Sequence, residues 1–194
     1  MIFHEKTYSV LVVSAGQKFD ETLTRMLPPS EYYPVQFVRN IAAARREMLA
    51  KSFDFVIVNA PLPDDPGIRF AADACGQSKT VVLLLVPGDI YESVNARVVP
   101  EGVFTLSKPV AAQSLLQGLK WMAPARERLG KLEQKATSLE EKMQEIRQVN
   151  RAKWLLIENQ GMSEGEAHRS IEKQAMDRCV SRRQVADEII RAYP

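Results

Sequence analysis

The chain has 194 residues, of which 45% are hydrophobic and 26% charged, and its formal net charge is +2. These proportions are typical of a globular protein and exclude a disordered or fibrous chain. The near-neutral balance excludes wholesale polyanion binding of the histone kind but permits a local basic patch. No apolar run approaches the ~20 residues that span a membrane. The sequence therefore predicts a cytoplasmic protein without a membrane segment.

Cysteine and histidine are scarce. Cys75 and Cys179 lie far apart, and His4 and His168 are the two histidines. Neither pair has the spacing of a zinc site, and two distant cysteines do not make a disulfide framework. The sequence also lacks a convincing pair of nucleophile and base. We therefore predict no metal site, no cofactor and no enzymatic activity.

Apolar runs alternate with helical patterns over residues 1–121. Five runs rich in β-branched residues predict buried strands at Ser9–Val13, Val35–Val38, Phe53–Val58, Thr80–Val86 and Val103–Leu106. The intervening segments predict helices at Lys18–Leu27, Ile41–Lys51, Gly67–Cys75, Ile90–Val99 and Ala111–Ala123. Continuous hydrophobic runs are expected where helices cover both faces of a parallel sheet. This alternation predicts an α/β domain with a doubly wound, five-stranded parallel sheet.

The apolar spacing changes at Met122 to alternating steps of three and four residues. Heptad positions a and d are occupied in turn by Met122, Ala125, Leu129, Leu132, Ala136, Leu139, Met143 and Ile146. Asn150 takes the next a position, where asparagine fixes register and dimer state in coiled coils. The pattern predicts a coiled-coil dimerisation helix over residues 122–150. The alternative is an amphipathic helix that folds back on its own domain.

Capping signals divide residues 151–194 into three helices. The first continues from the coiled coil and ends at Gly161, a residue suited to the left-handed position after a helix. Ser163 with Glu166, and Ser181 with Gln184, form the capping-box pattern that opens a helix. The sequence therefore predicts a small three-helix C-terminal domain.

The pattern VLVV…FDFVIVNAPLPDDPG…VVLLLV…LSKPV, within residues 9–110, resembles the receiver domain of two-component response regulators. A working receiver holds Mg²⁺ on an acidic pair after its first strand and phosphorylates an Asp at the end of its third strand. It also contacts the phosphoryl group with a Ser or Thr and a Lys. At these positions the chain has Ser14, Ala15, Asn59, Val86 and Lys108.

Only the lysine is retained at this degenerate phosphoacceptor site. An amide is not a useful nucleophile, and Mg²⁺ needs hard oxygen ligands, preferably anionic. The resemblance therefore implies a pseudo-receiver that works without aspartyl phosphorylation, through dimer contact or by docking a regulatory or ligand-sensing protein. We expect the nearby Asp64 and Asp65 to be solvated turn residues.

Residues 149–190 resemble the ANTAR domain of transcription antitermination regulators. The matching blocks include Ala152-Lys153, Gly161-Met162-Ser163-Glu164, Ala175-Met176 and Val185-Ala186. A pseudo-receiver, a coiled-coil stalk and an ANTAR domain, in this order, also resemble the architecture of amide-responsive antiterminators. The resemblance implies a dimeric RNA-binding protein that recognises paired stem-loops in a leader transcript and suppresses a terminator hairpin.

Basic residues of the first and third C-terminal helices are the candidate RNA contacts. They are Arg151, Lys153, Arg178, Arg182 and Arg183, with Arg147 placed to extend the charge along the first helix. Two arginines in the first turn of a helix, together with its free backbone N–H groups, suit a phosphate. The alternative interpretation is an ordinary solvated basic face. Trp154 either stacks on an unpaired base or packs between helices, and we expect His168 to be a packed helix residue.

Two other classes of function remain open. A coiled-coil dimer could act as a protein-docking scaffold without any nucleic acid. Three short helices could also imitate the helix-turn-helix of a DNA-binding response regulator. Past its first turn, however, the last helix (RRQVADEIIRAYP) is acidic and apolar, which disfavours insertion into a DNA groove.

Overall fold

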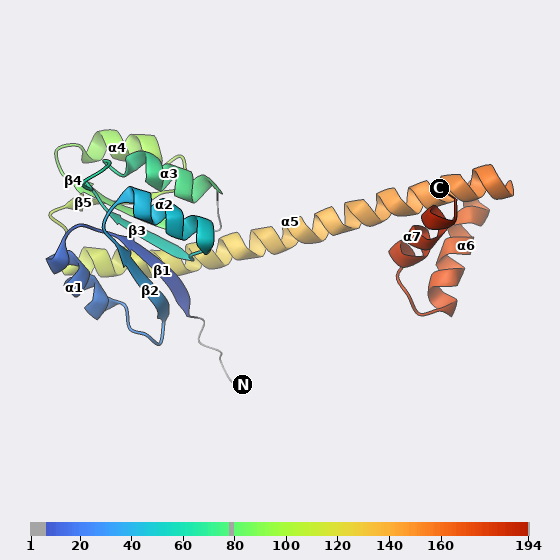
Figure 1. Ribbon diagram of the computed structural model, residues 1–194, viewed down its shortest axis with the longest axis horizontal. Coiled ribbons are helices and arrows are strands. Elements are labelled where there is room, and N and C mark those ends of the chain that lie inside the picture. The colour runs from blue at the N-terminus through green and yellow to red at the C-terminus, as the bar shows by residue number, and fades with distance from the viewer. Residues whose placement is uncertain (1–6, 78–79, 194) are drawn as a thin grey trace. The chain divides into compact units, whose positions relative to one another are not determined.

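The computed structural model describes residues 7–77 and 80–193, so His4 lies outside the described residues. The chain divides into two compact units, residues 1–130 and 131–194. Helix α5, Ala112–Gln160, contributes to both units (Figure 1). Within the described residues, no helix combines the length and the apolar character that a membrane crossing requires.

The first unit contains a five-stranded parallel sheet in the order β2-β1-β3-β4-β5. The strands are β1 (Tyr8–Val13), β2 (Tyr32–Val38), β3 (Phe55–Asn59), β4 (Val81–Pro87) and β5 (Phe104–Lys108). The helices are α1 (Gln17–Met26), α2 (Ile41–Ala50), α3 (Ile68–Gln77), α4 (Tyr91–Val98) and the beginning of α5. This arrangement confirms the predicted doubly wound α/β fold.

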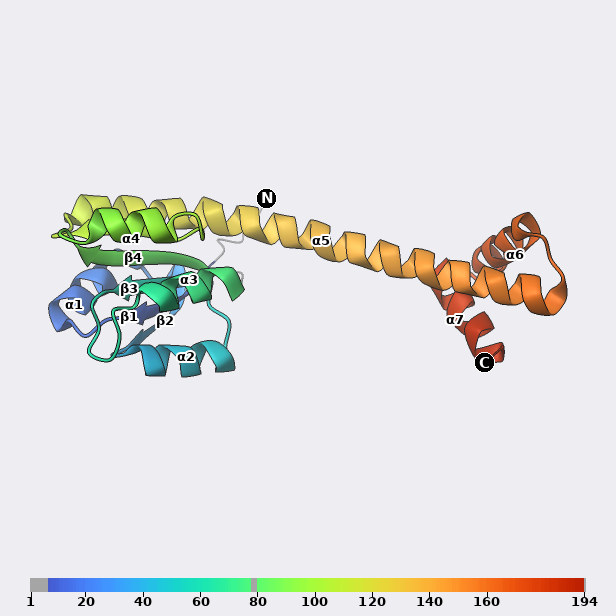
Figure 2. The ribbon, with the colours of Figure 1, turned by 90° about the horizontal axis from the view of Figure 1, so that it is seen from above.

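Helices flank the sheet in both ribbon views (Figure 1 and Figure 2). Two hydrophobic cores lie on opposite faces of the sheet. Along β1, Leu11 and Val13 point into the core covered by α2, α3 and α4, whereas Val10 and Val12 point into the core covered by α1 and α5. All four valine and leucine side chains are fully buried. Burial on both faces explains why the strands read as continuous hydrophobic runs.

Helix α5 differs from the prediction at the end of the first unit. The predicted boundary at residue 121 lies inside a single helix of 49 residues, and Pro124 is also inside it. Met122 is fully buried and packs with Leu115 and Leu119 against the sheet. The structure thus assigns the first predicted a position to the core of the first unit, because the helix keeps the same face toward the sheet through Met122.

The second unit is formed by the end of α5 with α6 (Glu164–Asp177) and α7 (Arg182–Ala192). Gly161 has the left-handed φ of +67° that ends α5. The Ser163 hydroxyl accepts a hydrogen bond from the Glu166 backbone N–H, and the Glu166 carboxylate accepts one from the Ser163 N–H at 2.8 Å. The predicted capping box is therefore present. Buried residues from all three helices, including Ala152, form one small core.

Candidate nucleic-acid interface and degenerate receiver site

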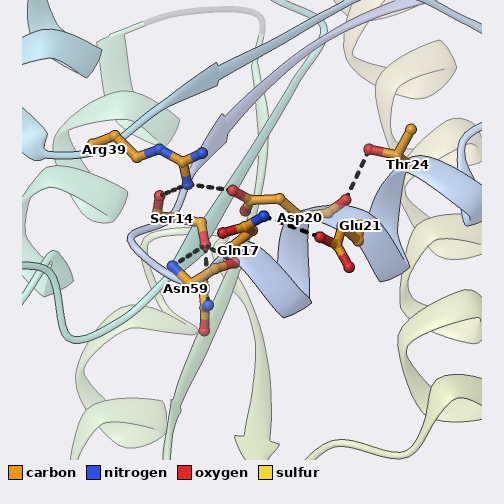
Figure 3. A network of polar contacts seen from close by, with 8 residues as sticks. Ser14, Gln17, Asp20, Glu21, Thr24, Arg39 and Asn59 are labelled. Carbon is orange, nitrogen blue, oxygen red and sulfur yellow. Dashed lines mark hydrogen bonds and ion pairs between the residues drawn. The ribbon is translucent and has the colours of Figure 1, made fainter.

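The carboxyl ends of β1, β3 and β5 bring three of the predicted degenerate positions together. The Asn59 amide Nδ2 donates to the Ser14 hydroxyl at 3.2 Å, and Lys108 Nζ donates to Asn59 Oδ1 at 3.1 Å. Lys108 also donates to the Ala60 carbonyl. We call Ser14, Asn59 and Lys108 the strand-end cluster; part of it is drawn in Figure 3. Each of its polar side chains has a partner inside the protein.

The donor set of the strand-end cluster does not fit Mg²⁺. A hydroxyl, an amide and an ammonium supply no anionic oxygen, and Mg²⁺ is usually held in proteins by carboxylates. The neighbouring Ala15 has no ligating group, and Val86 is fully buried within β4. Across residues 7–77 and 80–193, no group of three acidic, histidine or cysteine side chains is placed to hold a metal ion. Burial lowers the pKa of the Lys108 ammonium.

An ion pair beside the strand-end cluster was not predicted. Asp20 on α1 is only 8% exposed and pairs with Arg39, which follows β2. The same guanidinium donates to the Ser14 carbonyl at 3.1 Å (Figure 3). The second oxygen of the Asp20 carboxylate is buried without a hydrogen bond. The available signal was the helical spacing of Asp20 with Leu23 and Leu27, which places a carboxylate on the buried face of α1.

Asp64 and Asp65 lie in a loop, with Asp64 exposed, and their carboxylates also hold the backbone of nearby segments. The two oxygens of Asp64 accept hydrogen bonds from the backbone N–H groups of Ile41 and Ala42, both at 3.0 Å. The carboxylate thereby caps α2 from a distant loop, and the backbone hydrogen bonds lower its pKa. Asp65 accepts from the Gly67 N–H at 2.6 Å, where Gly67 has a φ of +79°.

The predicted RNA-contact residues of the second unit fall into two groups. In the first group, each cation is paired with a carboxylate of the same unit. The pairs are Lys153 with Glu164 at 3.0 Å, Arg178 with Glu188 at 2.6 and 2.8 Å, and Arg182 with Glu145 at 3.2 Å. Arg182 also lies 3.7 Å from Glu172. These ion pairs connect the helices of the unit to one another.

The second group is exposed and unpaired. Arg151 on α5 and Arg183 on α7 make no ion pair or hydrogen bond with another described side chain, and neither does Arg147. Arg183 lies in the first turn of α7, which is capped by the Ser181 hydroxyl. Guanidinium groups without an internal partner remain free to form forked hydrogen bonds with phosphate.

Comparison with known proteins agrees with both units. The family model of the ANTAR domain matches residues 137–190. The transcriptional regulatory protein PdtaR of Mycobacterium tuberculosis is 25% identical over 137 residues, covering 71% of this chain and 67% of the relative. The aliphatic amidase regulator of Pseudomonas aeruginosa is 27% identical over 121 residues, covering 62% of each chain.

Solved structures identify the fold of the first unit. The signal receiver domain of an HD domain-containing protein from Pseudomonas fluorescens matches with a TM-score of 0.56 and 26% identity, covering 69% of this chain and 96% of that domain. The receiver domain of the response regulator TorR matches with a TM-score of 0.52 and 18% identity, covering 60% and 96%. The chain joins a receiver-like domain to an ANTAR domain. Over most of its length it is also similar to the two regulatory proteins named above.

The ANTAR domain begins earlier in the chain than residues 149–190 suggested. Its match starts at residue 137, within the range predicted as a coiled-coil helix, so part of α5 belongs to both descriptions. Two further residues of the ANTAR domain have defined surroundings. His168 is partly exposed and lies 3.3 Å from Glu172 on the same helix. Trp154 is 69% exposed, so the structure does not bury it between helices.

An apolar stripe on α5 is exposed along the ANTAR domain. Leu132, Leu139, Met143 and Ile146 are 53%, 61%, 47% and 60% exposed. We call these four residues the seam. They occupy a and d positions of the predicted heptads and continue past the core of the first unit. The residues of α5 that are buried in the ANTAR core, Val149, Ala152 and Leu156, are not part of the seam and lie at other heptad positions.

Proposed function

We propose that this protein binds paired stem-loops in leader transcripts as a homodimer and thereby suppresses transcription termination, without aspartyl phosphorylation. The single observation that carries this proposal is the ANTAR match over residues 137–190, on a folded three-helix unit that leaves part of its basic charge unpaired. Its binding is stoichiometric, because an antiterminator acts by holding RNA in one secondary structure.

We expect Arg151 and Arg183 to be the phosphate contacts that contribute most to RNA affinity. Both are exposed and have no carboxylate partner among the described residues. Lys153, Arg178 and Arg182 must give up or share an internal carboxylate to contact RNA, so we assign them a smaller part. Neutralising phosphates releases counterions, and the affinity should therefore fall steeply as salt rises.

The seam supports the homodimer. A single chain leaves four large apolar side chains of one helix face in water, which favours association with another helix. Two parallel copies of α5 would bury the seam and place Asn150 opposite its counterpart, where it fixes the register. A dimer presents two ANTAR domains, which matches the pairing of two stem-loops.

The strand-end cluster supports independence from phosphorylation. Asn59 occupies the phosphoacceptor position and is hydrogen-bonded to Ser14 and Lys108. A receiver-like domain of this kind is suited to contact with another protein. We therefore propose that a regulatory or ligand-sensing protein docks on this domain and controls access to RNA.

The test starts from RNA selected by the protein itself. Wild-type protein selects from a pool of paired hairpins with randomised loops, and fluorescence anisotropy at two salt concentrations then measures the affinity for the enriched RNA. Arg183→Ala is the cleaner variant, because Arg182 also holds α7 to Glu145 and its removal disturbs the fold. Glu141→Ala, at an exposed heptad position of α5 that faces away from the seam, serves as the matched control.

We expect enrichment of loop sequences, loss of binding to a loop-scrambled RNA, and at least tenfold weaker binding of the Arg183→Ala variant. Enrichment without loop preference would leave a non-specific basic surface. If the pool shows no enrichment and the protein is nevertheless dimeric by sedimentation, the scaffold function replaces this proposal. Preferential binding of a DNA duplex would favour the DNA-binding class instead.

A further inference from the structure

Two arginines and a tryptophan share one exposed face of α5 within the ANTAR domain. Arg147, Arg151 and Trp154 follow one another at steps of four and three residues, so they lie on successive turns of one side of the helix. All three are exposed, Trp154 to 69%. We call these residues the basic–aromatic strip. With a rise of ~1.5 Å per residue, the strip is ~10 Å long.

The arginines of the strip have no ion-pair partner among the described residues. Neither arginine makes an ion pair or a hydrogen bond with another described side chain. By contrast, Arg178 of the same unit is held by two hydrogen bonds to Glu188. The indole of Trp154 is a large aromatic surface left in water, although Trp side chains usually find burial or a partner. Positive charge beside an open aromatic face is the combination that binds single-stranded nucleic acid.

We propose that the basic–aromatic strip is an RNA contact of the ANTAR domain, in which Arg147 and Arg151 bind phosphates and Trp154 stacks on an unpaired loop base. This inference rests on the RNA-binding function proposed above and names the part of the RNA that the strip recognises. Loop bases are unstacked from the helix, so they are the bases that an aromatic side chain can reach. The strip therefore distinguishes a hairpin with an open loop from a continuous duplex.

A second copy of the chain fits the strip less well than RNA does. In a parallel coiled coil, the g residue of one helix meets the following e residue of its partner. In the predicted heptads this contact pairs Lys135 with Glu140 of a second copy, which is favourable. One heptad later it sets Lys142 against Arg147 of the second copy, and the like charges repel. Trp154 occupies neither an a nor a d position.

The residue at the next d position also disfavours a second copy of the chain as the partner of the strip. It is Lys153, whose ammonium turns to Glu164 at 3.0 Å within its own ANTAR domain. Because Lys153 is charged and forms this ion pair, it does not extend the apolar seam beyond Asn150. The apolar seam thus ends at Asn150, within the length of the strip, and Arg151 and Trp154 lie beyond it.

The first experiment uses the intrinsic fluorescence of the full chain. Trp121 and Trp154 are its two tryptophans, so the Trp121→Phe variant reports on Trp154 alone. The probe is an unlabelled RNA hairpin enriched by wild-type protein from the randomised-loop pool. We expect its addition to quench Trp154 emission in step with the binding measured by anisotropy. The Trp154→Phe variant, which reports on Trp121, is the matched control and should show no comparable quenching. Unchanged Trp154 emission during binding would overturn the proposal.

The second experiment measures affinity. Trp154→Leu keeps an apolar side chain but removes the aromatic face, and should weaken binding of the hairpin on the order of tenfold. Trp154→Tyr should retain most of the affinity, and Trp121→Leu all of it. The Arg147→Ala/Arg151→Ala double variant should reduce the slope of log affinity against log salt by about two.

Sedimentation of the same variants separates the outcomes. If Trp154→Leu dissociates the dimer, a second copy is the occupant of the strip and the proposal fails. If Trp154→Leu binds the hairpin as tightly as wild type, the strip is not an RNA contact, although the protein remains an RNA-binding regulator. If wild-type protein enriches no hairpin at all, the proposed function itself fails, and this failure is visible before any variant is made.

Discussion

The strand-end cluster and the basic–aromatic strip treat their polar groups in opposite ways. In the strand-end cluster, the hydroxyl, amide and ammonium groups bond to one another or to nearby backbone. In the strip, two guanidinium groups and an indole are exposed, and the guanidinium groups have no ion-pair or hydrogen-bond partner among the described residues. Groups that satisfy one another gain little from a ligand, whereas unpaired groups retain their full capacity to bind one. The comparison favours our proposals that RNA binds to the second unit and that a protein docks on the first.

The largest effect should follow from removing the scaffold that holds the strip. Ile171 is fully buried in the ANTAR core, and Ile→Ala in such a site costs about 2–5 kcal/mol. We expect Ile171→Ala to unfold the small C-terminal unit and abolish RNA binding while the receiver-like domain stays folded. Urea unfolding, followed by fluorescence in the Trp121→Phe and Trp154→Phe backgrounds, reports the two units separately.

The matched control for Ile171→Ala is a core substitution in the other unit. Val56→Ala, at a fully buried position of β3, should shift the transition reported by Trp121 and leave the one reported by Trp154. Equal shifts of both transitions in either variant would show that the two units unfold together. The two regions could then not be treated as independent.

A smaller effect is expected beside the strand-end cluster. Arg39→Ala leaves the Asp20 carboxylate buried without its ion-pair partner, which should cost about 2 kcal/mol. RNA affinity should not change, because the ion pair belongs to the receiver-like domain. Urea unfolding measures the cost, and Arg39→Lys, which keeps the charge, should recover part of it. Unfolding of Arg39→Ala at the wild-type midpoint would mean that water replaces the guanidinium.

The sequence predicted those features that depend on local pattern. Continuous apolar runs identified the strands, and the Ser163 capping box identified the start of α6 because both partners are three residues apart. The degenerate positions Ser14, Asn59 and Lys108 could be expected to meet, since the carboxyl ends of parallel strands share one edge of the sheet. Each of these inferences needs only the period of an element or its order in the chain.

Contacts between different helices, strands and loops could not be predicted from the periodicity of the sequence. Asp20 and Arg39 lie on different elements, and the capping of α2 by Asp64 depends on how a loop folds over the helix. The internal pairing of Arg178 with Glu188 likewise depends on how α7 packs after its turn. The sequence therefore listed the basic residues of the ANTAR domain but could not tell the paired ones from the free ones.

The pH dependence of the ANTAR domain should be a smaller effect still. Hydrogen bonds from Lys153, Ser163 and Arg178 hold the pKa values of Glu164, Glu166 and Glu188 below their usual value of 4.5. The folded state then binds fewer protons than the unfolded state. The stabilisation is present above pH 4.5 and is lost as the pH falls through the folded pKa values.

Thermal unfolding between pH 6 and pH 3, followed by Trp154 emission, measures this loss. The expected decrease in the melting midpoint is small, because the three carboxylates are on the surface and solvent screens their interactions. Glu188→Gln should reduce the decrease, whereas Glu141→Gln, on the exposed face of α5 away from the seam, should leave it unchanged. A midpoint that rises on acidification would contradict the assigned direction of the shifts.

The smallest effect is expected where a carboxylate is returned to the strand-end cluster. Asn59→Asp supplies a nucleophilic oxygen, but Ser14 and Ala15 still provide no acidic pair for Mg²⁺. Incubation with acetyl phosphate and Mg²⁺ should therefore leave the intact mass of this variant unchanged, and its RNA affinity should equal that of wild type.

The Ser14→Asp/Ala15→Asp/Asn59→Asp variant is the matched comparison, because it restores the metal ligands together with the nucleophile. Phosphoryl uptake by the triple variant alone would show that the missing ligands keep the cluster inert. Uptake by the single variant would contradict this account and would place a latent phosphoacceptor in the receiver-like domain.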